Sequence, residues 1–356
     1  MIQLVLDDTH VKKHLFPFTL TRSCADIRVG ILTIRQKWEL LLGVKVRVNG
    51  DEYLEPPHSD TQPVVFAGNI IPGKAFVDDL LKGHYPQEDF LQQSSIRILQ
   101  QPWHIFEYND WALREDFALI TAGRQSQPIP ASVSTIAPAN IFIEEGAKLQ
   151  HCILNAAAGP IYIGRNAEIM EGASIRGPFA LCEGAAVKMG ARIYGATTIG
   201  PYSLVGGEIK NSVIFGYSNK AHDGYLGDAV IGEWCNLGAG TTNSNIKNTA
   251  SNVKIWSEGE KKFITAGLKC GLLMGDYSRC SINTSFNTGT VVGACANIFG
   301  GGLLPKYIPS FSWGAQQPVK YVFEKALEDI TNWKKLKNQL LSEKEIQQLQ
   351  HIFERN

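Results

Sequence analysis

Polar side chains that could carry acid–base chemistry concentrate in residues 207–246. His222 is suited to remove a proton from an amine, because the ordinary pKa of histidine is about 6.5. A lone exposed histidine more often has no chemical role, but its polar neighbours favour the chemical interpretation here. Lys210 and Lys220 could hold a phosphate group, or could lie on a solvated face. Tyr225 could contact a substrate or pack inside the fold.

The asparagines and histidines of the repeat lead to two further predictions. Asn236 and Asn245 could bind a ligand, or could form the ladder of stacked asparagines found in repetitive β-folds. His151 and His222 are the two histidines in the repeat described next. A zinc site of the three-histidine type needs three of them on neighbouring turns, so we expect no zinc enzyme of the carbonic anhydrase kind.

A six-residue period organises the chain around these residues. Every sixth residue from 163 onward is aliphatic: Ile163, Ile169, Ile175, Leu181, Val187, Ile193, Ile199 and Val205. The register then slips by two residues and resumes at Val213, Asn219, Tyr225, Ile231 and Leu237, and again from Leu268 to Ile298. One inward aliphatic residue per hexapeptide is typical of a parallel β-helix, and a β-sandwich with coincidental spacing is the weaker alternative. We predict this β-helix over residues 131–305, with the functional residues at the slip.

The flanking segments have other patterns. Residues 1–105 indicate a small α/β domain, with strands at Ile2–Leu6, Val44–Val48 and Pro63–Ala67 and helices at Leu32–Leu42 and Phe76–Leu81. Residues 106–130 indicate a linking helix and loop. Residues 306–356 indicate an amphipathic helical tail that covers a surface.

Composition narrows the class of protein. The chain has 356 residues, 44% of them hydrophobic, which is a globular composition. Lysine plus arginine equals aspartate plus glutamate at 34 each, so nothing favours nucleic acid or an acidic membrane as a partner. Neither a signal peptide nor a membrane span is expected. The seven cysteines form no C-x-x-C pair, which favours a reducing cytoplasm over a disulfide framework.

The segment KNSVIFGYSNKAHDGYLGDAVIGEWCNLGAGTTNSN resembles the acetyltransferase half of a bifunctional enzyme family. That family is the N-acetylglucosamine-1-phosphate uridyltransferase/glucosamine-1-phosphate N-acetyltransferases. The shared pieces are Lys210, Ser218-x-Lys220-Ala221, His222, Tyr225-Leu226-Gly227-Asp228-Ala229, Ile231-Gly232 and Asn236-x-Gly238-Ala239-Gly240-Thr241. The resemblance implies a left-handed β-helix, a homotrimer with sites between subunits, and a place in UDP-N-acetylglucosamine synthesis for the cell envelope.

The resemblance also implies a role for individual residues. His222 corresponds to the catalytic base that deprotonates the amine of glucosamine-1-phosphate before it attacks acetyl-CoA. Residues implied to bind the sugar phosphate are Lys210, Tyr225 and Asn236, with Arg192 as a further phosphate ligand one residue out of the family's spacing. Residues implied to contact acetyl-CoA are Ala239, Asn245, Gly275, Gly293 and Ala294. Ile246 stands where the family has a tyrosine, so coenzyme contacts here differ in detail.

The N-terminal domain departs further from the family. Its first glycine is Gly30, so it lacks the glycine-rich loop that wraps nucleotide phosphates. It resembles a shortened variant in which Arg22 and Arg28 could meet the phosphates of UTP, and Asp7 or Asp8 could hold Mg²⁺. Surface arginines beside a helix cap are an equal alternative. Whether uridylyl transfer survives stays open.

Three functions are consistent with these sequence features. The leading one is acetyl-CoA-dependent N-acetylation of glucosamine-1-phosphate, with or without uridylyl transfer to N-acetylglucosamine-1-phosphate. A second keeps the acyltransferase but changes the acceptor to another amino sugar or a sugar nucleotide. A third is a non-catalytic trimeric scaffold that binds sugar nucleotides, against which the intact motif around His222 speaks.

Overall fold

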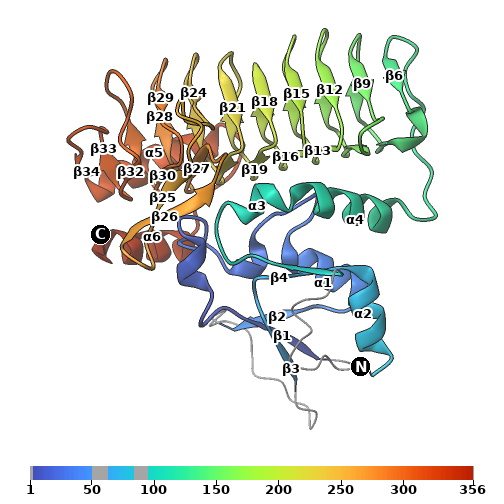
Figure 1. Ribbon diagram of the computed structural model, residues 1–356, viewed down its shortest axis with the longest axis horizontal. Helices are drawn as coiled ribbons and strands as arrows, with labels where there is room; N and C mark the ends of the chain where they lie inside the picture. The colour runs from blue at the N-terminus through green and yellow to red at the C-terminus, as the bar shows by residue number, and fades with distance from the viewer. Residues whose placement is uncertain (1–2, 50–62, 84–94, 356) are drawn as a thin grey trace.

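The structure is a computed structural model that describes residues 3–49, 63–83 and 95–355. Its main body is a parallel β-helix, below which the N-terminal domain lies, while two C-terminal helices pack near one end (Figure 1). The expected order of α/β domain, β-helix and helical tail is confirmed.

Three parallel sheets form the sides of the β-helix. Sheet 1 contains β7 (Ile141–Ile143), β10 (Ile161–Ile163), β13 (Phe179–Leu181), β16 (Thr197–Ile199), β19 (Val213–Ile214), β22 (Val230–Ile231), β27 (Leu272–Met274), β30 (Thr290–Val292) and β32 (Tyr307–Ile308). Sheet 2 contains β8 (Lys148–Leu149), β11 (Glu168–Ile169), β14 (Ala186–Val187), β17 (Leu204–Val205), β20 (Asn219–Lys220), β23 (Asn236–Leu237), β28 (Arg279–Cys280), β31 (Asn297–Ile298), β33 (Ser312–Trp313) and the antiparallel β34 (Val319–Lys320). Sheet 3 contains β6 (Ser134–Ile136), β9 (Ile153–Asn155), β12 (Ser174–Arg176), β15 (Arg192–Tyr194), β18 (Glu208–Lys210) and β21 (Tyr225–Gly227). A separate pair, β24 (Thr242–Asn243) and β29 (Ser285–Phe286), follows β21.

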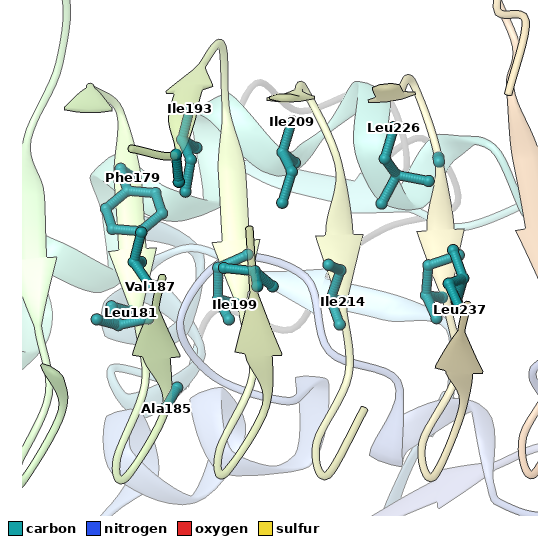
Figure 2. Packing of buried hydrophobic residues seen from close by; sticks show 14 of the residues in the cluster. Phe179, Leu181, Ala185, Val187, Ile193, Ile199, Ile209, Ile214, Leu226 and Leu237 are labelled. Carbon is teal, nitrogen blue, oxygen red and sulfur yellow. The ribbon is translucent and has the colours of Figure 1, made fainter. Parts of the chain in front are cut away.

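Aliphatic side chains stack inside the β-helix from one coil to the next, as Figure 2 shows. The parallel register places Ile193 beside Ile209 and Ile209 beside Leu226 in sheet 3. Each of the three is at most 1% exposed. Burying a side chain of this size stabilises the fold by roughly 1.5–3 kcal/mol, so the stack fixes the positions of the outward residues between its members.

The predicted inward register is confirmed at Ile231 and Leu237, but it differs at the first three positions after the slip. The inward residues are Ile214, Lys220 and Leu226, each one position after the residue that we predicted. Val205 and Ile209 are inward four residues apart, because the turn between β17 and β18 has two residues. The turns between β11 and β12 and between β14 and β15 have four. Val213, Asn219 and Tyr225 therefore point outward. The prediction for Leu268 is also wrong, since its side chain is 58% exposed.

The N-terminal domain has a small parallel sheet in the order β2 (Arg47–Asn49), β1 (Leu4–Asp7) and β3 (Val64–Ala67). Helix α1 (Ile34–Leu42) begins with a capping box between Thr33 and Gln36. Also present are α2 (Lys74–Leu81), the antiparallel pair β4 (Ile70–Pro72) and β5 (Ile96–Ile98), and the short helices η1 (Lys12–Leu15) and η2 (Cys24–Asp26). The predicted strands and helices are confirmed within a few residues, except that residue 2 lies outside the described residues.

The N-terminal domain buries the outward face of sheet 1. Helices α3 (His104–Glu107) and α4 (Asn109–Thr121) lie between the domain and the β-helix (Figure 1). The rings of Phe18 and Phe215 pack with centroids 5.5 Å apart. Leu273 and Val291 of sheet 1 belong to the same buried cluster as Phe18. Sheet 1 is thus covered on both faces.

Two features lie outside the predicted plan. A hairpin of β25 (Val253–Ser257) and β26 (Lys262–Gly267) interrupts the repeat and packs on the N-terminal domain. The β-helix continues past residue 305 through β32 and β33. Helices α5 (Phe323–Lys335) and α6 (Glu343–Arg355) then pack on the row of turns between sheets 1 and 2. Among the described helices, none has the length and apolarity that a membrane crossing requires.

Candidate functional site

His222 lies in the row of turns that joins sheet 2 to sheet 3, which we call the His222 edge. Its turn follows β20 and precedes β21. On the next coil, the amide of Gly240 donates a hydrogen bond of 3.0 Å to the carbonyl of Asp223, so the turn containing Ala239 lies directly beside it. The His222 side chain is exposed and makes no hydrogen bond with the described residues. Its imidazole is thus open to an incoming amine.

Lys220 holds the His222 turn from inside the β-helix. Its side chain occupies an inward position and is 3% exposed. The ammonium donates to the carbonyls of Gly206, at 3.1 Å, and of His222. Burial lowers the pKa of Lys220 to about 8. Lys220 is therefore a positioning residue, and the interpretation as an external phosphate ligand is wrong.

Tyr225 belongs to a hydrogen-bond network on the outward face of sheet 3. Its phenol oxygen accepts a bond of 3.0 Å from Nδ2 of Asn245, which also donates to Oδ2 of Asp228 at 2.5 Å. Asn211 Nδ2 donates to the other oxygen of Asp228 at 2.7 Å. Burial, with a smaller effect of the Asp228 carboxylate, raises the pKa of Tyr225. The phenol therefore keeps its proton at neutral pH and can donate it to a sugar oxygen.

The Tyr225 ring lies across Gly227. A Cβ atom at Gly227 would stand 2.1 Å from the phenol oxygen, closer than any real contact. Glycine is therefore required here for the ring to reach Asn245. Neither Asn211 nor the constraint at Gly227 emerged from sequence reasoning, because both depend on which coils become neighbours.

Two predicted phosphate ligands lie on neighbouring strands of sheet 3. Lys210 pairs across the strands with Gly227, and no described carboxylate forms an ion pair with it. Arg192 is 59% exposed, and its Nε lies 3.9 Å from Oε2 of Glu208. The structure therefore brings Lys210 to the Tyr225 network, whereas Arg192 already faces an acid.

Asn236 does not join this network in a single chain. It points outward from sheet 2, on the other side of the His222 edge from Tyr225. Asn219 Nδ2 lies 3.4 Å from its Oδ1, which fits the asparagine ladder that we weighed as the structural alternative.

Gly275, Gly293 and Ala294 are buried elsewhere in the chain. A Cβ atom at Gly275 would stand 3.0 Å from Pro17, and one at Gly293 would stand 2.4 Å from the amide of Ser310. Ala294 is 0% exposed and packs in the cluster formed with the tail helices. No surface remains there for a coenzyme, so the expected acetyl-CoA contacts of these three residues are wrong.

A second candidate site lies in the N-terminal domain. A cavity of about 910 Å³ opens where β1 and β2 end, and Asp8 and Asn49 line it. Ligands of open α/β sheets bind at the carboxyl ends of parallel strands, where the strand order reverses, as it does around β1. The turn that contains Arg22 lines one side, and α6 lines another.

Asp8 is the better of the two predicted metal ligands. Its Oδ2 accepts a bond of 2.9 Å from the amide of Cys24, while its buried Oδ1 has no partner. Asp7 does not line the cavity, and hydrogen bonds from Thr9 lower the pKa of Asp7. No group of three metal-binding side chains occurs in the described part of the chain. Mg²⁺ often takes one or two carboxylates plus substrate phosphates, so Asp8 fits an ion that arrives with a nucleotide.

The two predicted phosphate-binding arginines serve mainly as structural contacts. Arg22 pairs with Asp276 and lies 3.3 Å from Glu233. Burial opposes the charge of Arg22, but the two carboxylates outweigh it and raise its pKa. Arg28 donates to the carbonyl of Ile31 and lies outside the cavity lining, so the cavity does not support its predicted nucleotide contact.

Sequence comparison gives the following relatives. Residues 3–96 match the family model described as sugar nucleotidyl transferase. The bifunctional sugar-1-phosphate nucleotidylyltransferase/acetyltransferase of Sulfurisphaera tokodaii is 29% identical over 206 residues, which are 57% of this chain and 45% of that protein. The chain is homologous to bifunctional nucleotidyltransferase/acetyltransferases. The bifunctional protein GlmU of Methanocaldococcus jannaschii is 34% identical over 87 residues, which are 24% of this chain and 21% of that protein. Its counterpart from Synechococcus elongatus is 24% identical over 218 residues, which are 55% of this chain and 44% of that protein.

Each match covers less than half of the relative's length. Among solved structures, the Francisella novicida UDP-N-acetylglucosamine acyltransferase is 13% identical and has a TM-score of 0.32. That alignment covers 64% of this chain and 84% of that one. The polySia-specific acetyltransferase NeuO is 16% identical with a TM-score of 0.21, over 53% of this chain and 85% of that one. Similarities of this size add nothing about activity.

Proposed function

We propose that this chain is an acetyl-CoA-dependent N-acetyltransferase that acts on glucosamine-1-phosphate. The observation that carries the proposal is the placement of Lys210, Tyr225 and Asn245 on one face, beside the turn of the exposed His222. A cation, a phenol donor and a base within one face are what an amino sugar phosphate and its acetylation require.

In the reaction, His222 takes a proton from the ammonium of the sugar, because only the free amine is a nucleophile. The amine attacks the thioester carbonyl of acetyl-CoA, so a C–N bond forms and the C–S bond breaks. The departing thiolate of the coenzyme takes up a proton. Lys210 binds the phosphate and Tyr225 donates to the sugar. The amide of Ala239 donates to no described residue, unlike those of Gly238 and Gly240, and is the donor for the thioester oxygen.

The working protein is proposed to be a homotrimer in the cytoplasm. Met189 and Ile282, on the same edge as His222, are 69% and 67% exposed, which supports a subunit contact along this edge. A neighbouring subunit would then bring its own sheet 2, with Asn236, towards the Tyr225 network. All seven cysteines are free and buried, which supports a reducing compartment.

Release of the coenzyme thiol from acetyl-CoA in the presence of glucosamine-1-phosphate tests this function. His222→Ala should lower the rate by about 10²–10⁴-fold. His151→Ala is the matched control, since His151 is also an exposed histidine of the same row of turns. An unchanged rate in His222→Ala would exclude its role as the base. If the wild type binds acetyl-CoA but releases no thiol, the acceptor is another amino sugar or a sugar nucleotide. Loss of acetyl-CoA binding as well would favour the scaffold.

A second function is proposed for the N-terminal domain, namely binding of UTP or a UDP-sugar with Mg²⁺ held by Asp8. The cavity at the carboxyl ends of β1 and β2 supports it, as does the family match over residues 3–96. Mg²⁺ would neutralise phosphate charge there. Pyrophosphate release from UTP and N-acetylglucosamine-1-phosphate measures whether uridylyl transfer accompanies binding, and Asp8→Asn should abolish Mg²⁺-dependent binding.

A further inference from the structure

We propose that the C-terminal helix α6 forms the phosphate-binding wall of the N-terminal cavity, with Lys344 and His351 as its ligands. The ligand class is a nucleotide with a di- or triphosphate group. This inference rests on the proposed nucleotide binding of the N-terminal domain and adds the tail, to which no chemical role has been assigned so far.

The spacing along α6 supports the proposal. Lys344, Gln347, Gln348 and His351 all line the cavity, and steps of three, four and seven residues place them on one face of a helix. Another face of α6 buries Leu349, which is 1% exposed and packs with Trp234 and Tyr277 in the cluster with the tail helices. Burial of Leu349 therefore orients the polar stripe towards the cavity.

Helix α6 is held in place as a fixed wall. Glu345 accepts a hydrogen bond of 2.9 Å from the phenol of Tyr277 and one of 2.5 Å from Lys334. Its other carboxylate oxygen accepts from the amide of Ser342 at 2.8 Å. These bonds outweigh the effect of burial and lower the pKa of Glu345. The stripe thus has a defined position before any ligand arrives.

Charge around the cavity shows why the tail is needed. On the side of the N-terminal domain, the charge of Arg22 is neutralised by Asp276 and Glu233. Asp8 and Asp26 line the same cavity, and Asp26 pairs with Arg35. Lys12, which lines the cavity and has no ion pair among the described residues, is then the main cation from this domain. A polyphosphate needs more positive charge and more donors than one lysine offers.

The tail compensates for a missing element. No glycine precedes Gly30, so the segment after β1 has no glycine-rich loop whose amides could cradle phosphates. Side chains of α6 can supply those donors from the opposite wall. The cavity volume of about 910 Å³ lies within the range of about 300–1,000 Å³ typical of small-molecule sites.

Calorimetric titration of the full chain with UTP, and separately with UDP-N-acetylglucosamine, in the presence of Mg²⁺ tests the wall. We expect Lys344→Gln and His351→Gln each to weaken binding by about tenfold or more, as loss of a charge-assisted hydrogen bond requires. Arg355→Gln is the matched control, because Arg355 is an exposed cation of α6 that does not line the cavity. It should bind within about twofold of the wild type. Thermal unfolding of each variant checks that the fold is intact.

The outcomes separate the inference from the proposed function. If Lys344→Gln and His351→Gln bind the nucleotide as tightly as the wild type does, α6 is not the phosphate-binding wall. The proposed nucleotide binding would still stand. Equal weakening in Arg355→Gln would also overturn it, because the effect would then be one of net charge. If the wild type binds neither nucleotide, both the proposed nucleotide binding and the role of α6 are wrong. Thiol release by the same sample then tests acetyl transfer separately. Binding of either nucleotide with the expected variant effects supports the wall and identifies the ligand.

Discussion

Asp276 and Tyr277 are adjacent in sequence, yet they anchor opposite walls of the same cavity. The Asp276 carboxylate accepts a hydrogen bond of 2.5 Å from Thr21 and pairs with Arg22. The Tyr277 phenol donates to Glu345 of α6. A single turn of the β-helix therefore sets the distance between the N-terminal domain and the tail.

Asp276→Asn should destabilise the protein by about 3 kcal/mol. Asp276 is 2% exposed, and its loss leaves the Arg22 guanidinium buried with Glu233 as its remaining acid. The change is measured as the free energy of unfolding in guanidinium chloride. Asp78→Asn, which breaks the exposed pair with Lys74, should cost less than about 0.5 kcal/mol and serves as the control. Equal small effects would show that the Asp276 pair does not hold the domain.

Lys220→Met should change how stability depends on pH. The pKa of Lys220 is about 8 in the fold and 10.5 in the unfolded chain, so the unfolded state binds more protons between these values. Wild-type stability relative to the variant should therefore rise with pH across this window, by about 3 kcal/mol in total. Below pH 8 the full cost of the buried charge is present. Unfolding of both proteins at several pH values gives the difference, and parallel curves would contradict a buried charge.

The same variant should also slow acetyl transfer. Methionine fills the inward position but cannot donate to the carbonyl of His222. The turn that carries His222 therefore loses the hydrogen bond that fixes its position. We expect the rate constant to fall while affinity for acetyl-CoA stays close to the wild type. Lys188→Met, which removes a lysine from the same row of turns on an earlier coil, should have no effect on the rate.

Much of the fold follows from the six-residue period, because one inward aliphatic residue per step is typical of few folds besides a β-helix. The register after residue 205 could not be read in the same way. A two-residue turn and an inward lysine both break the pattern, and Lys220 looks like a surface residue in sequence. For this reason the sequence does not decide whether Tyr225 contacts a substrate or packs inside the fold. The strand pairing shows that Tyr225 points outward.

Residues that depend on distant contacts escaped sequence reasoning. Gly275 lies beneath Pro17, more than 250 positions earlier in the chain, and nothing near either residue indicates the contact. For α6 a signal existed: the steps from Lys344 to His351 follow a helical period. The apolar residues of the tail predict only a helix that covers a surface, whereas the spacing of its polar residues also predicts a polar stripe.

Gly227→Ala should impair the sugar phosphate site. The added methyl group would collide with the Tyr225 ring and displace the phenol from Asn245. We expect the KM for glucosamine-1-phosphate to rise about tenfold or more, with a stability loss of about 1–3 kcal/mol. Gly216→Ala is the control, because a Cβ there would meet its nearest atom at 3.4 Å. A normal KM in Gly227→Ala would show that the position of the phenol does not matter.

Light scattering during size-exclusion chromatography tests the subunit contact. The wild type should have three times the 39.2 kDa mass of one chain. Ile282→Asp, at the His222 edge, should shift the protein towards single chains, because a buried charge without a partner is costly. Leu336→Asp alters a residue of the tail that is 74% exposed, and it should leave the mass unchanged. A wild-type monomer would rule out a site shared between subunits.

The covered face of sheet 1 has a consequence for how the protein can be divided. Phe215 packs against Phe18, and Leu273 and Val291 belong to the same buried cluster. Separating the α/β part from the β-helix would therefore expose an apolar surface. Neither fragment could keep that surface from aggregating. We therefore expect the two parts to unfold together in one transition, although the sequence pattern changes at the boundary between them.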